Sequence, residues 1–419
     1  MRFIRAGALA GGLRAAGMVS MLIFVACMSS WMEAGDFGTL ALIISMATLA
    51  AGFGGFGQAE MNIRAIAARR AAGEEGAVVE VPNASVGLVV RVSAVIGALL
   101  ALYVAIDGHP PALWISVLVL TVSLSMMTGL AGAARAADRF VLALLPKDVA
   151  WRLITIALVG GLVLAGQGTE IKVVAPILAL SALTCAFWQA RALCIRAGSL
   201  HRPHPEVLTR THLTGSATIA FSLFALVALS TLDVIVVGAL ISPEAAAAYF
   251  PANRLAILAA FAALPIQLVI EPRIADMLVR KDLAGAQRLS NAATILQSSS
   301  SLVLGLALLL GFPYYGVLFP TAGAETFQVL VILVAGFVIG SLCGMSGPIL
   351  MMAGHQRILA QVNLLFACIA AALLVFAASR GDLIAVALVV TAMEVLRKLA
   401  MVGYAFRRTG LLPFSLRKL

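Results

Sequence analysis

This sequence contains little charge. Asp, Glu, Lys and Arg make up 11% of its 419 residues, whereas a soluble domain carries about 25%. Hydrophobic residues account for 62% of the chain, and the mean hydropathy is +1.05. Such a composition excludes an ordinary soluble globular domain. It predicts an all-α integral membrane protein.

The motifs of enzymes and metalloproteins are also missing. The sequence has no nucleotide-binding signature, no zinc-ligand spacing and no aspartate-rich sugar-nucleotide motif. Its five cysteines are scattered, which is typical of apolar filler rather than of ligands or disulfides. The five histidines lie in or near connections without a partner set. We therefore expect no catalytic residue, no metal, no bound cofactor and no enzymatic activity.

Long apolar stretches dominate what is present. A bilayer core of about 30 Å requires about 20 apolar residues per helix. Twelve stretches meet this requirement, at 8–31, 37–58, 84–106, 112–133, 140–166, 171–193, 211–240, 245–270, 291–312, 324–350, 357–377 and 383–405. The sequence thus predicts twelve transmembrane helices joined by short connections.

The basic residues define the orientation of these spans. Of the 29 Lys and Arg residues, 20 fall on the two termini and every second connection, and seven lie inside spans. The opposite connections hold only Lys172 and Arg380. Short basic loops stay in the cytoplasm, so both termini are expected there. This bias explains the net charge of +10 without a nucleic-acid partner, and it predicts attraction to anionic lipid headgroups.

The N-terminus also has features of a signal peptide, with Arg2 and Arg5 as its basic region and residues 18–27 as its apolar region. An uncut first span gives an even number of helices and places both ends on the basic side. We therefore retain 8–31 as a membrane span.

The two halves of the chain share a feature. A basic amphipathic segment, 60–70, follows the second span, and a similar one, 271–281, follows the eighth. Arg64 and Arg273 are 209 residues apart, half of the chain. The spacing favours two six-helix lobes, 1–200 and 201–419, related by a parallel pseudo-two-fold repeat. The alternative is that any two cytoplasmic loops after membrane helices look alike.

Charged side chains inside the spans are the candidates for function, because each costs about 2.5–3.5 kcal/mol at the centre of a membrane helix. Five cations lie about two helical turns from the cytoplasmic edge. They are Arg14, Arg91, Lys147, Arg397 and Lys398. Each could extend to the interface along its apolar stem. Together they could instead form an inward-facing basic vestibule.

The fifth span is the most unusual. It contains Pro146, Lys147, Asp148 and Arg152 within seven positions. Pro146 cannot donate to the carbonyl of Leu142, so we expect the helix to bend or open there. Asp148 and Arg152 are four residues apart and can pair on one face. The segment is either a self-neutralised pair beside a snorkelling lysine or a functional cluster.

Two further charged sets lie in the second half. Asp233 and Arg254 both lie about two turns from the connection at 242–244 and can meet across the hairpin. Glu394, Arg397 and Lys398 share one face of the last span. Each set could form a structural ion pair, or it could take part in gating or ion coupling.

Several short motifs resemble a known family. They are Glu33-Ala-Gly-Asp36-Phe-Gly38, the Gly-rich end of the second span at 52–57, the Arg64 segment, Asp233-x-x-x-x-Gly238, and Tyr249-x-x-Ala-Asn253-Arg254 followed by Pro265, Pro272 and Arg273. These resemble the motifs of polysaccharide flippases of the multidrug/oligosaccharidyl-lipid/polysaccharide exporter superfamily. Ala248 stands where that pattern usually has glycine. The likeness covers the whole chain in helix count and order, and it is strongest over 230–290.

The resemblance implies two lobes around a central cavity, working by alternating access in the bacterial cytoplasmic membrane. It implies transport of an undecaprenyl-pyrophosphate-linked oligosaccharide to the outer leaflet, for surface polysaccharide or exopolysaccharide. Other membrane proteins of polysaccharide assembly are the implied partners, and a Na⁺ or H⁺ gradient is the implied energy source. The substrate-binding cations would be Arg14, Arg91, Lys147, Arg152, Arg254, Arg397 and Lys398, and the gating or ion-coupling acids Asp148, Asp233 and Glu394.

Two other functions were weighed. A cation-coupled small-molecule or multidrug antiporter of the same superfamily would have a cavity dominated by carboxylates. A membrane scaffold or glycan polymerase is a non-transport alternative, but a polymerase should carry a substantial outer loop. Since seven cations outnumber three acids inside the spans, the sequence favours the flippase.

Overall fold

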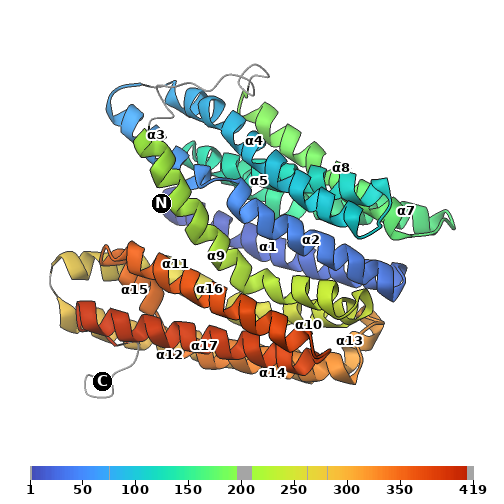
Figure 1. Ribbon diagram of the computed structural model, residues 1–419. Helices are drawn as coiled ribbons and strands as arrows, with labels where there is room; N and C mark the ends of the chain where they lie inside the picture. Colours follow the sequence, from blue (N-terminus) through green and yellow to red (C-terminus); the bar gives the residue numbers. More distant parts are fainter. Residues whose placement is uncertain (1, 75, 196–209, 262, 281, 413–419) are drawn as a thin grey trace. The chain divides into compact units, whose positions relative to one another are not determined.

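The computed structural model describes residues 2–74, 76–195, 210–261, 263–280 and 282–412, and the regular structure of these residues is helical throughout. The chain divides into two compact units, Met1–Thr231 and Leu232–Leu419. This division falls within helix α9 (Figure 1). The lobe boundary predicted near residue 200 lies in segment 196–209, outside the described residues.

The described residues of the first unit hold eight α-helices, the π-helical turn η1 and most of a ninth α-helix, α9. They are α1 (Arg2–Trp31), α2 (Ala34–Gly54), α3 (Gln58–Ala71), α4 (Ala77–Ile106), α5 (Pro111–Ala136), α6 (Phe140–Leu145), η1 (Pro146–Ala150), α7 (Trp151–Leu164), α8 (Ile171–Ala192) and α9 (Arg210–Leu240). The second unit holds the end of α9 with α10 (Pro243–Phe261), α11 (Ala263–Val279), α12 (Leu283–Leu310), α13 (Phe312–Leu318), α14 (Ala324–Ser341), α15 (Ser346–Met352), α16 (Gln356–Ala378) and α17 (Leu383–Thr409).

Nine helical segments of the described chain are long and apolar enough to cross a membrane. They correspond to nine of the twelve predicted spans and establish a multi-pass membrane protein. The other three predicted spans are not among these nine. Span 140–166 contains η1, residue 262 within span 245–270 lies outside the described residues, and α17 is continuous over Leu383–Thr409 but carries Glu394, Arg397 and Lys398.

The predicted span 324–350 is also divided. Helix α14 ends at Ser341, and α15 begins at Ser346. Gly344 between them has φ of 55°, in the left-handed region that favours glycine. The apolar pattern continues across this turn, which is why the sequence alone predicted one helix.

The basic amphipathic segment of the first half is a separate helix, α3. Phe56 and Gly57, with φ of 45° and 65°, turn the chain between α2 and α3. In the second half, the corresponding segment forms the later part of α11, which begins at Ala263. In both halves, the predicted basic segment is thus largely helical in the described residues.

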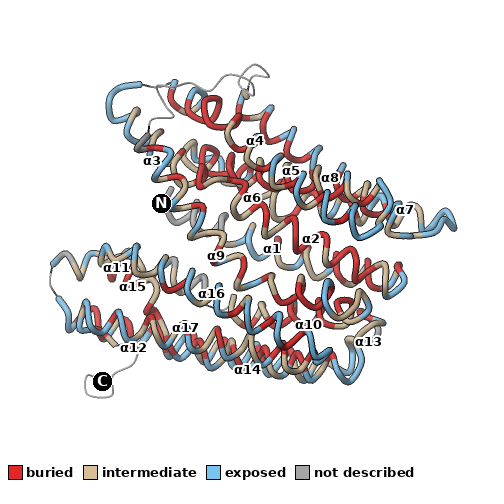
Figure 2. The backbone as a smooth tube through the Cα atoms, in the orientation of Figure 1, coloured by how far each residue is buried: buried red, intermediate tan, exposed pale blue. Residues whose placement is uncertain are grey.

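Close helix packing organises the first unit. Helix α5 packs against α2, α3, α4 and α8, and most of its residues are buried (Figure 2). At Gly132 of α5, an added Cβ atom would overlap the main chain of Ala59 in α3. Such close approach of helix backbones is typical of small residues in membrane bundles. Leu99 of α4, 63% exposed, illustrates the apolar surface left for lipid.

Helices α10, α12, α14, α16 and α17 form the main packed body of the second unit. Helix α14 packs against α10, α12 and α17, and α16 packs against α17. Buried Tyr249 and Phe250 of α10 are among its largest enclosed side chains.

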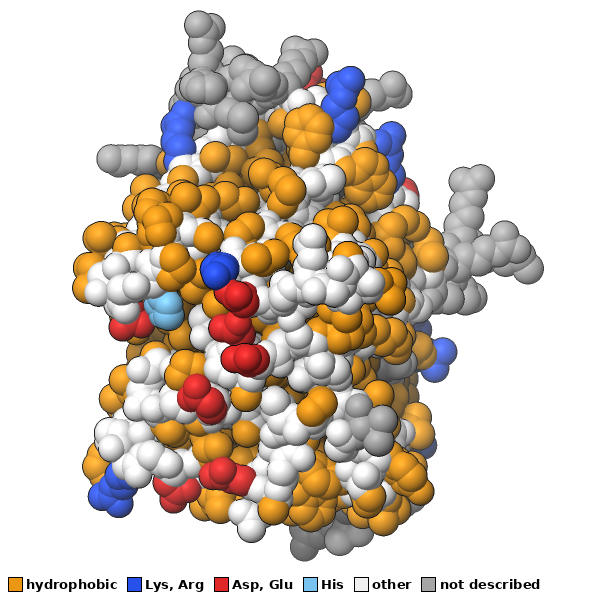
Figure 3. Space-filling view, turned by 90° about the vertical axis from the view of Figure 1, so that its right-hand side faces the viewer, with side chains coloured by type: hydrophobic (Ala, Val, Ile, Leu, Met, Phe, Trp, Pro, Cys, Tyr) orange, Lys and Arg blue, Asp and Glu red, His pale blue; other side chains and the backbone are white. Residues whose placement is uncertain are grey.

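The connections predicted to face outward carry mainly acidic residues. Near these helix ends lie Glu33, Asp36, Asp107, Glu170, Glu244, Glu325 and Asp382. Several Asp and Glu side chains are visible in Figure 3, with few Lys or Arg between them. The charge asymmetry therefore involves both sets of connections, basic in one set and acidic in the other.

Candidate functional site

The unusual segment of the fifth span forms the turn η1, as the position of Pro146 predicts. Leu142 lies four residues before Pro146, and its carbonyl accepts a hydrogen bond from Gln189 Nε2 of α8 at 3.0 Å. Gln189 is fully buried. A side chain from a neighbouring helix thus satisfies the acceptor that the missing proline N–H leaves open.

Helix α1 packs closely on this turn. A Cβ atom on Gly17 would lie 2.9 Å from the Cβ atom of Asp148. Ser20 Oγ donates to the Asp148 carbonyl at 3.0 Å, and the Arg152 guanidinium donates to the same carbonyl. Arg152 also donates to the carbonyl of Gly17 at 3.4 Å. These contacts hold α1 against η1.

Arg152 therefore contacts the main-chain oxygen of Asp148. Its guanidinium lies 4.9 Å from the centre of the Trp151 ring, within cation–π range. Within the described part of the chain, the side chains of Lys147 and Asp148 are half-buried and make neither a hydrogen bond nor an ion pair.

Two more predicted cations lie in the first unit. Arg14 lies on α1, three residues before Gly17, and is exposed. Arg91 lies on α4 and is also exposed. With Lys147 and Arg152, they give this unit four in-span cations, against the single acid Asp148.

The second unit contains a buried carboxylate at Asp233 of α9. Its Oδ2 atom accepts hydrogen bonds from Tyr249 Oη at 2.9 Å and Asn253 Nδ2 at 2.6 Å, both on α10. All three side chains are buried. Asp233 Oδ1 and Asn253 Oδ1 have no hydrogen-bond partner among the described residues. Among the described residues, these two buried oxygens thus lack a hydrogen bond of normal geometry, although the Val234 main-chain N–H lies near the Asp233 carboxylate.

Arg254 does not form the predicted ion pair with Asp233. Its guanidinium lies over the Phe250 ring, 4.7 Å from the ring centre. Asn253 precedes Arg254 and occupies the face of α10 that meets the carboxylate. Because neighbouring helix positions point about 100° apart at 3.6 residues per turn, the same helix face cannot present both.

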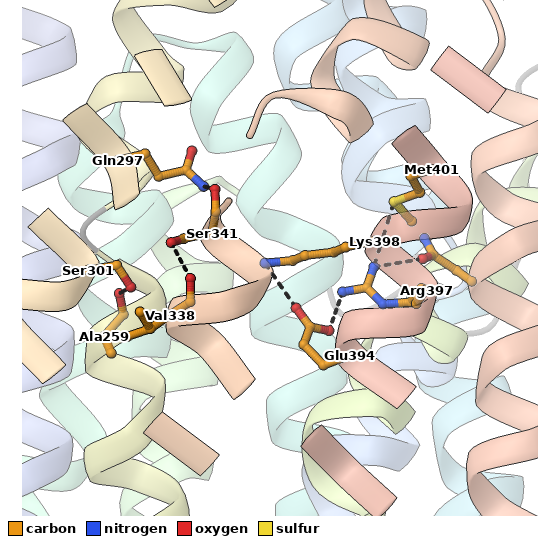
Figure 4. Close-up of polar contacts among 10 residues, drawn as sticks. Ala259, Gln297, Ser301, Val338, Ser341, Glu394, Arg397, Lys398 and Met401 are labelled. Carbon is orange, nitrogen blue, oxygen red and sulfur yellow. Dashed lines mark hydrogen bonds and ion pairs between the residues drawn. The ribbon is translucent and has the colours of Figure 1, made fainter. Parts of the chain in front are cut away.

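The charged set of the last helix is confirmed as one cluster. Glu394 forms ion pairs with Arg397 and, at 3.1 Å, with Lys398 (Figure 4). Arg397 Nη1 also donates to Asn363 Oδ1 of α16 at 3.1 Å. Two cations thus share one carboxylate, and the set keeps a formal charge of +1.

Sequence reasoning missed the polar side of α12. Its buried polar residues recur at helical spacing, namely Gln287, Ser290, Asn291, Thr294, Gln297 and Ser301. Gln297 Nε2 lies 3.5 Å from the Ser341 carbonyl of α14 (Figure 4). The spacing of three and four residues was visible in the sequence. These side chains carry no charge, so the distribution of charged residues does not point to them.

The ten predicted site residues therefore belong to separate sets. The first unit holds Arg14, Arg91, Lys147, Asp148 and Arg152, and the second holds Asp233, Arg254, Glu394, Arg397 and Lys398. In the described residues, no group of three or more His, Cys, Asp or Glu side chains is arranged to hold a metal ion.

Comparison with known proteins identifies the family. The family model described as "Polysaccharide biosynthesis protein" matches residues 13–278, more than half of the 419-residue chain. The chain belongs to this polysaccharide biosynthesis protein family. The predicted membership of the exporter superfamily is thereby confirmed. The family match ends within α11, so the later helices of this polysaccharide biosynthesis protein are placed by fold likeness instead.

Solved structures show the same fold across the chain. An inward-facing multidrug resistance MATE family transporter of the MOP superfamily superposes with a TM-score of 0.66 at 14% identity, covering 96% of this chain and 98% of that one. The Vibrio cholerae MATE transporter VcmN in its bent form gives 0.60 at 14% identity, covering 98% of each chain.

A MOP superfamily transporter from Pyrococcus furiosus gives a TM-score of 0.56 at 14% identity, covering 97% of this chain and 95% of that one. Its description states that the reverse polarity of its binding pocket suggests a different function. The comparison with curated proteins gave no match. The chain thus has the fold of the MATE transporters.

Proposed function

We propose that this protein is an alternating-access flippase that moves an undecaprenyl-pyrophosphate-linked oligosaccharide from the inner to the outer leaflet. The product would supply surface polysaccharide or exopolysaccharide synthesis in a bacterial cytoplasmic membrane. The observation that carries this proposal is the family match over 13–278, combined with the basic character of the first unit. That unit holds four in-span cations and one in-span acid.

The chemistry of the substrate fits these cations. A lipid pyrophosphate carries several negative charges, and Arg and Lys bind phosphate through charge-assisted hydrogen bonds. Lys147 has no side-chain partner among the described residues, and Arg14 is exposed on the helix that packs against η1. Both can therefore bind an anionic group without first breaking a described ion pair. Arg91 and Arg152 would add charge to the same set.

The proposal includes a topology. It has twelve spans in two six-helix lobes related by a pseudo-two-fold axis, with both termini in the cytoplasm. The apolar stretches, the Lys and Arg distribution and the similar basic segments 60–70 and 271–281 support this topology. Anionic lipids and other membrane proteins of polysaccharide assembly are the partners we expect.

The test begins with deletion of the gene in the native host. We expect loss of surface polymer and accumulation of lipid-linked repeat units on the cytoplasmic side. Complementation with Arg14→Gln, Arg91→Gln, Lys147→Gln or Arg152→Gln should then restore about tenfold less polymer than wild type, the equivalent of about 1.4 kcal/mol of binding. Lys172→Gln is the matched control, since Lys172 is exposed and pairs with Glu170 outside the proposed site. Full export by all four site variants would exclude the site.

A second candidate is a cation-coupled multidrug antiporter. The observation that favours it is the fold likeness to MATE transporters, together with buried acids at Asp233 and Glu394. It predicts normal polysaccharide in the deletion strain and increased sensitivity to cationic drugs. The same strain therefore separates the two functions.

A further inference from the structure

The short segment 410–412, which follows α17, packs against the start of α12. Gly410 has φ of 71° and ends α17 in the left-handed conformation, so the chain leaves the helix axis there. Leu411 comes next and is 2% exposed. Its main-chain N–H donates to Thr409 Oγ1 at 3.3 Å. We call residues 410–412 the strap.

Gln287 of α12 binds the main chain of the strap through both ends of its amide group. Its Nε2 atom donates to the Leu412 carbonyl at 2.7 Å, and its Oε1 atom accepts from the Leu412 N–H at 2.9 Å. Nε2 also donates to Asn291 Oδ1 at 2.8 Å, and Ser290 Oγ donates to the Leu412 carbonyl at 3.4 Å. A neighbouring β-strand would bind an extended peptide with the same pair of main-chain hydrogen bonds. The start of α12 therefore recognises the main chain of the strap.

The side chain of the strap is held by an apolar cluster that draws on several helices. Leu411 belongs to a buried cluster that includes Ile274 of α11, Ala286 of α12, Ile349 of α15 and Met401 of α17. Helix α11 packs against both α12 and α15, and α15 packs against α17 (Figure 1). The strap joins the end of α17 to the start of α12. It thereby closes a ring of four helices, α12, α11, α15 and α17.

We propose that the start of α12 is a docking site for the strap, and that the strap is a releasable clasp on this four-helix ring. Main-chain hydrogen bonds to Gln287 and burial of the Leu411 side chain hold the clasp closed. Release would leave α11, α12 and α15 in place but would remove the link from α17 to α12. The strap would then control how readily this end of the second unit rearranges.

The chemistry of the contact suits release. The strap is three residues long, and one amide group and one leucine side chain provide its main contacts. Segments with so few contacts open locally while the rest of the fold stays intact. By the proposed topology, this end of the unit faces the cytoplasm, so water can replace the two hydrogen bonds between Gln287 and Leu412. This inference does not depend on which molecule the protein transports.

The test is hydrogen–deuterium exchange, read by mass spectrometry, on the purified full-length protein in lipid nanodiscs. In wild type, peptides covering the strap should exchange at least about tenfold faster than peptides covering 393–405 of α17, because the strap opens without the helix. Gln287→Leu should accelerate exchange of the strap, of α15 and of the end of α11 by about tenfold. Gln356→Leu is the matched control, since Gln356 is exposed at the start of α16, and it should change none of these rates. Strap exchange as slow as that of α17 in wild type, or unchanged exchange of α15 and α11 in Gln287→Leu, overturns the proposal.

Thiol labelling provides a second test that separates release of the strap from unfolding. Cys343 lies two residues before Met345, a member of the same apolar cluster, and is 6% exposed, whereas Cys185 of the first unit is 4% exposed. Leu411→Ala should raise the maleimide labelling rate of Cys343 by about tenfold and leave that of Cys185 unchanged. Leu411→Met keeps the side-chain volume and should label like wild type.

Two results of the labelling experiment contradict the clasp. Equal increases at Cys343 and Cys185 in Leu411→Ala would show general unfolding, and an unchanged rate at Cys343 would show that the strap does not hold this end closed. Neither test measures glycan transport, so their failure leaves the flippase proposal standing.

Discussion

Gln189 of α8 donates a hydrogen bond at 3.0 Å to the carbonyl of Leu142 in α6, the acceptor that Pro146 cannot reach. A side chain 47 residues away thus replaces the main-chain hydrogen bond that Pro146 removes. The contact explains how an interrupted helix is tolerated among apolar helices, where no water can satisfy the carbonyl.

This relationship predicts a coupled effect of two substitutions. Gln189→Leu should lower the free energy of unfolding by about 1–3 kcal/mol, because the Leu142 carbonyl then lacks its donor. In a Pro146→Ala background, the restored main-chain N–H can reach that carbonyl, so Gln189→Leu should cost less. A double-mutant cycle on thermal or denaturant unfolding in detergent measures the difference. Equal costs in both backgrounds would contradict the assigned compensation.

The Glu394 cluster predicts a large effect of removing one charge. Glu394→Gln leaves Arg397 and Lys398 without their shared carboxylate. Breaking a buried ion pair in this way costs about 3–5 kcal/mol, and the three side chains are 24% exposed or less. Asp276→Asn is the matched control, since it removes an exposed pair with Arg280 at 3.0 Å, worth at most about 1 kcal/mol. The free energies of unfolding of both variants should be compared under one set of conditions. Similar decreases in the two variants would show that the cluster is not a buried network.

Much of this organisation was predictable from the sequence. Apolar length and the Lys and Arg distribution predicted the helical membrane fold, and Pro146 predicted the interruption at η1. The i,i+3 and i,i+4 spacing of Glu394, Arg397 and Lys398 predicted their cluster. Each of these features is local, so helix geometry alone determines it.

Other features depend on contacts between helices and could not be read from one segment. The choice of Asn253 over Arg254 as the partner of Asp233 depends on the rotation of α10 against α9. The Gln189–Leu142 bond depends on the register of α8 against α6. The turn at Gly344 lies in an apolar run whose composition suits a continuous helix equally well.

Close backbone packing predicts that two glycines respond oppositely to the same substitution. An added Cβ atom at Gly132 of α5 would overlap the carbonyl and Cα of Ala59 in α3, and a main chain held at both ends of a helix cannot move aside cheaply. Gly132→Ala should therefore destabilise the protein by at least about 1–3 kcal/mol, the cost of overpacking.

Gly161 of α7 is the control for this substitution. A Cβ atom there would meet no atom within 4 Å, so Gly161→Ala should leave stability unchanged or raise it by up to about 1 kcal/mol through helix propensity. The melting temperatures of both variants in the same detergent give the comparison. If the Gly132→Ala protein is as stable as wild type, α3 and α5 can move apart without cost. The tight α3–α5 contact is then not required to hold α3 in place.

The position of Lys398 predicts a link between packing and transport. Its stem crosses toward Gly340 of α14, where an added Cβ atom would lie 3.2 Å from its Cδ and Nζ atoms. Gly340→Val should push the ammonium group away from Glu394 and reduce glycan export at unchanged protein level. Gly403→Val, on α17 itself with nothing within 4 Å of an added Cβ, should export normally. If the Gly340 and Gly403 variants export equally well, the Lys398–Glu394 pair has no part in transport. Its role would then be confined to holding α17 in the second unit.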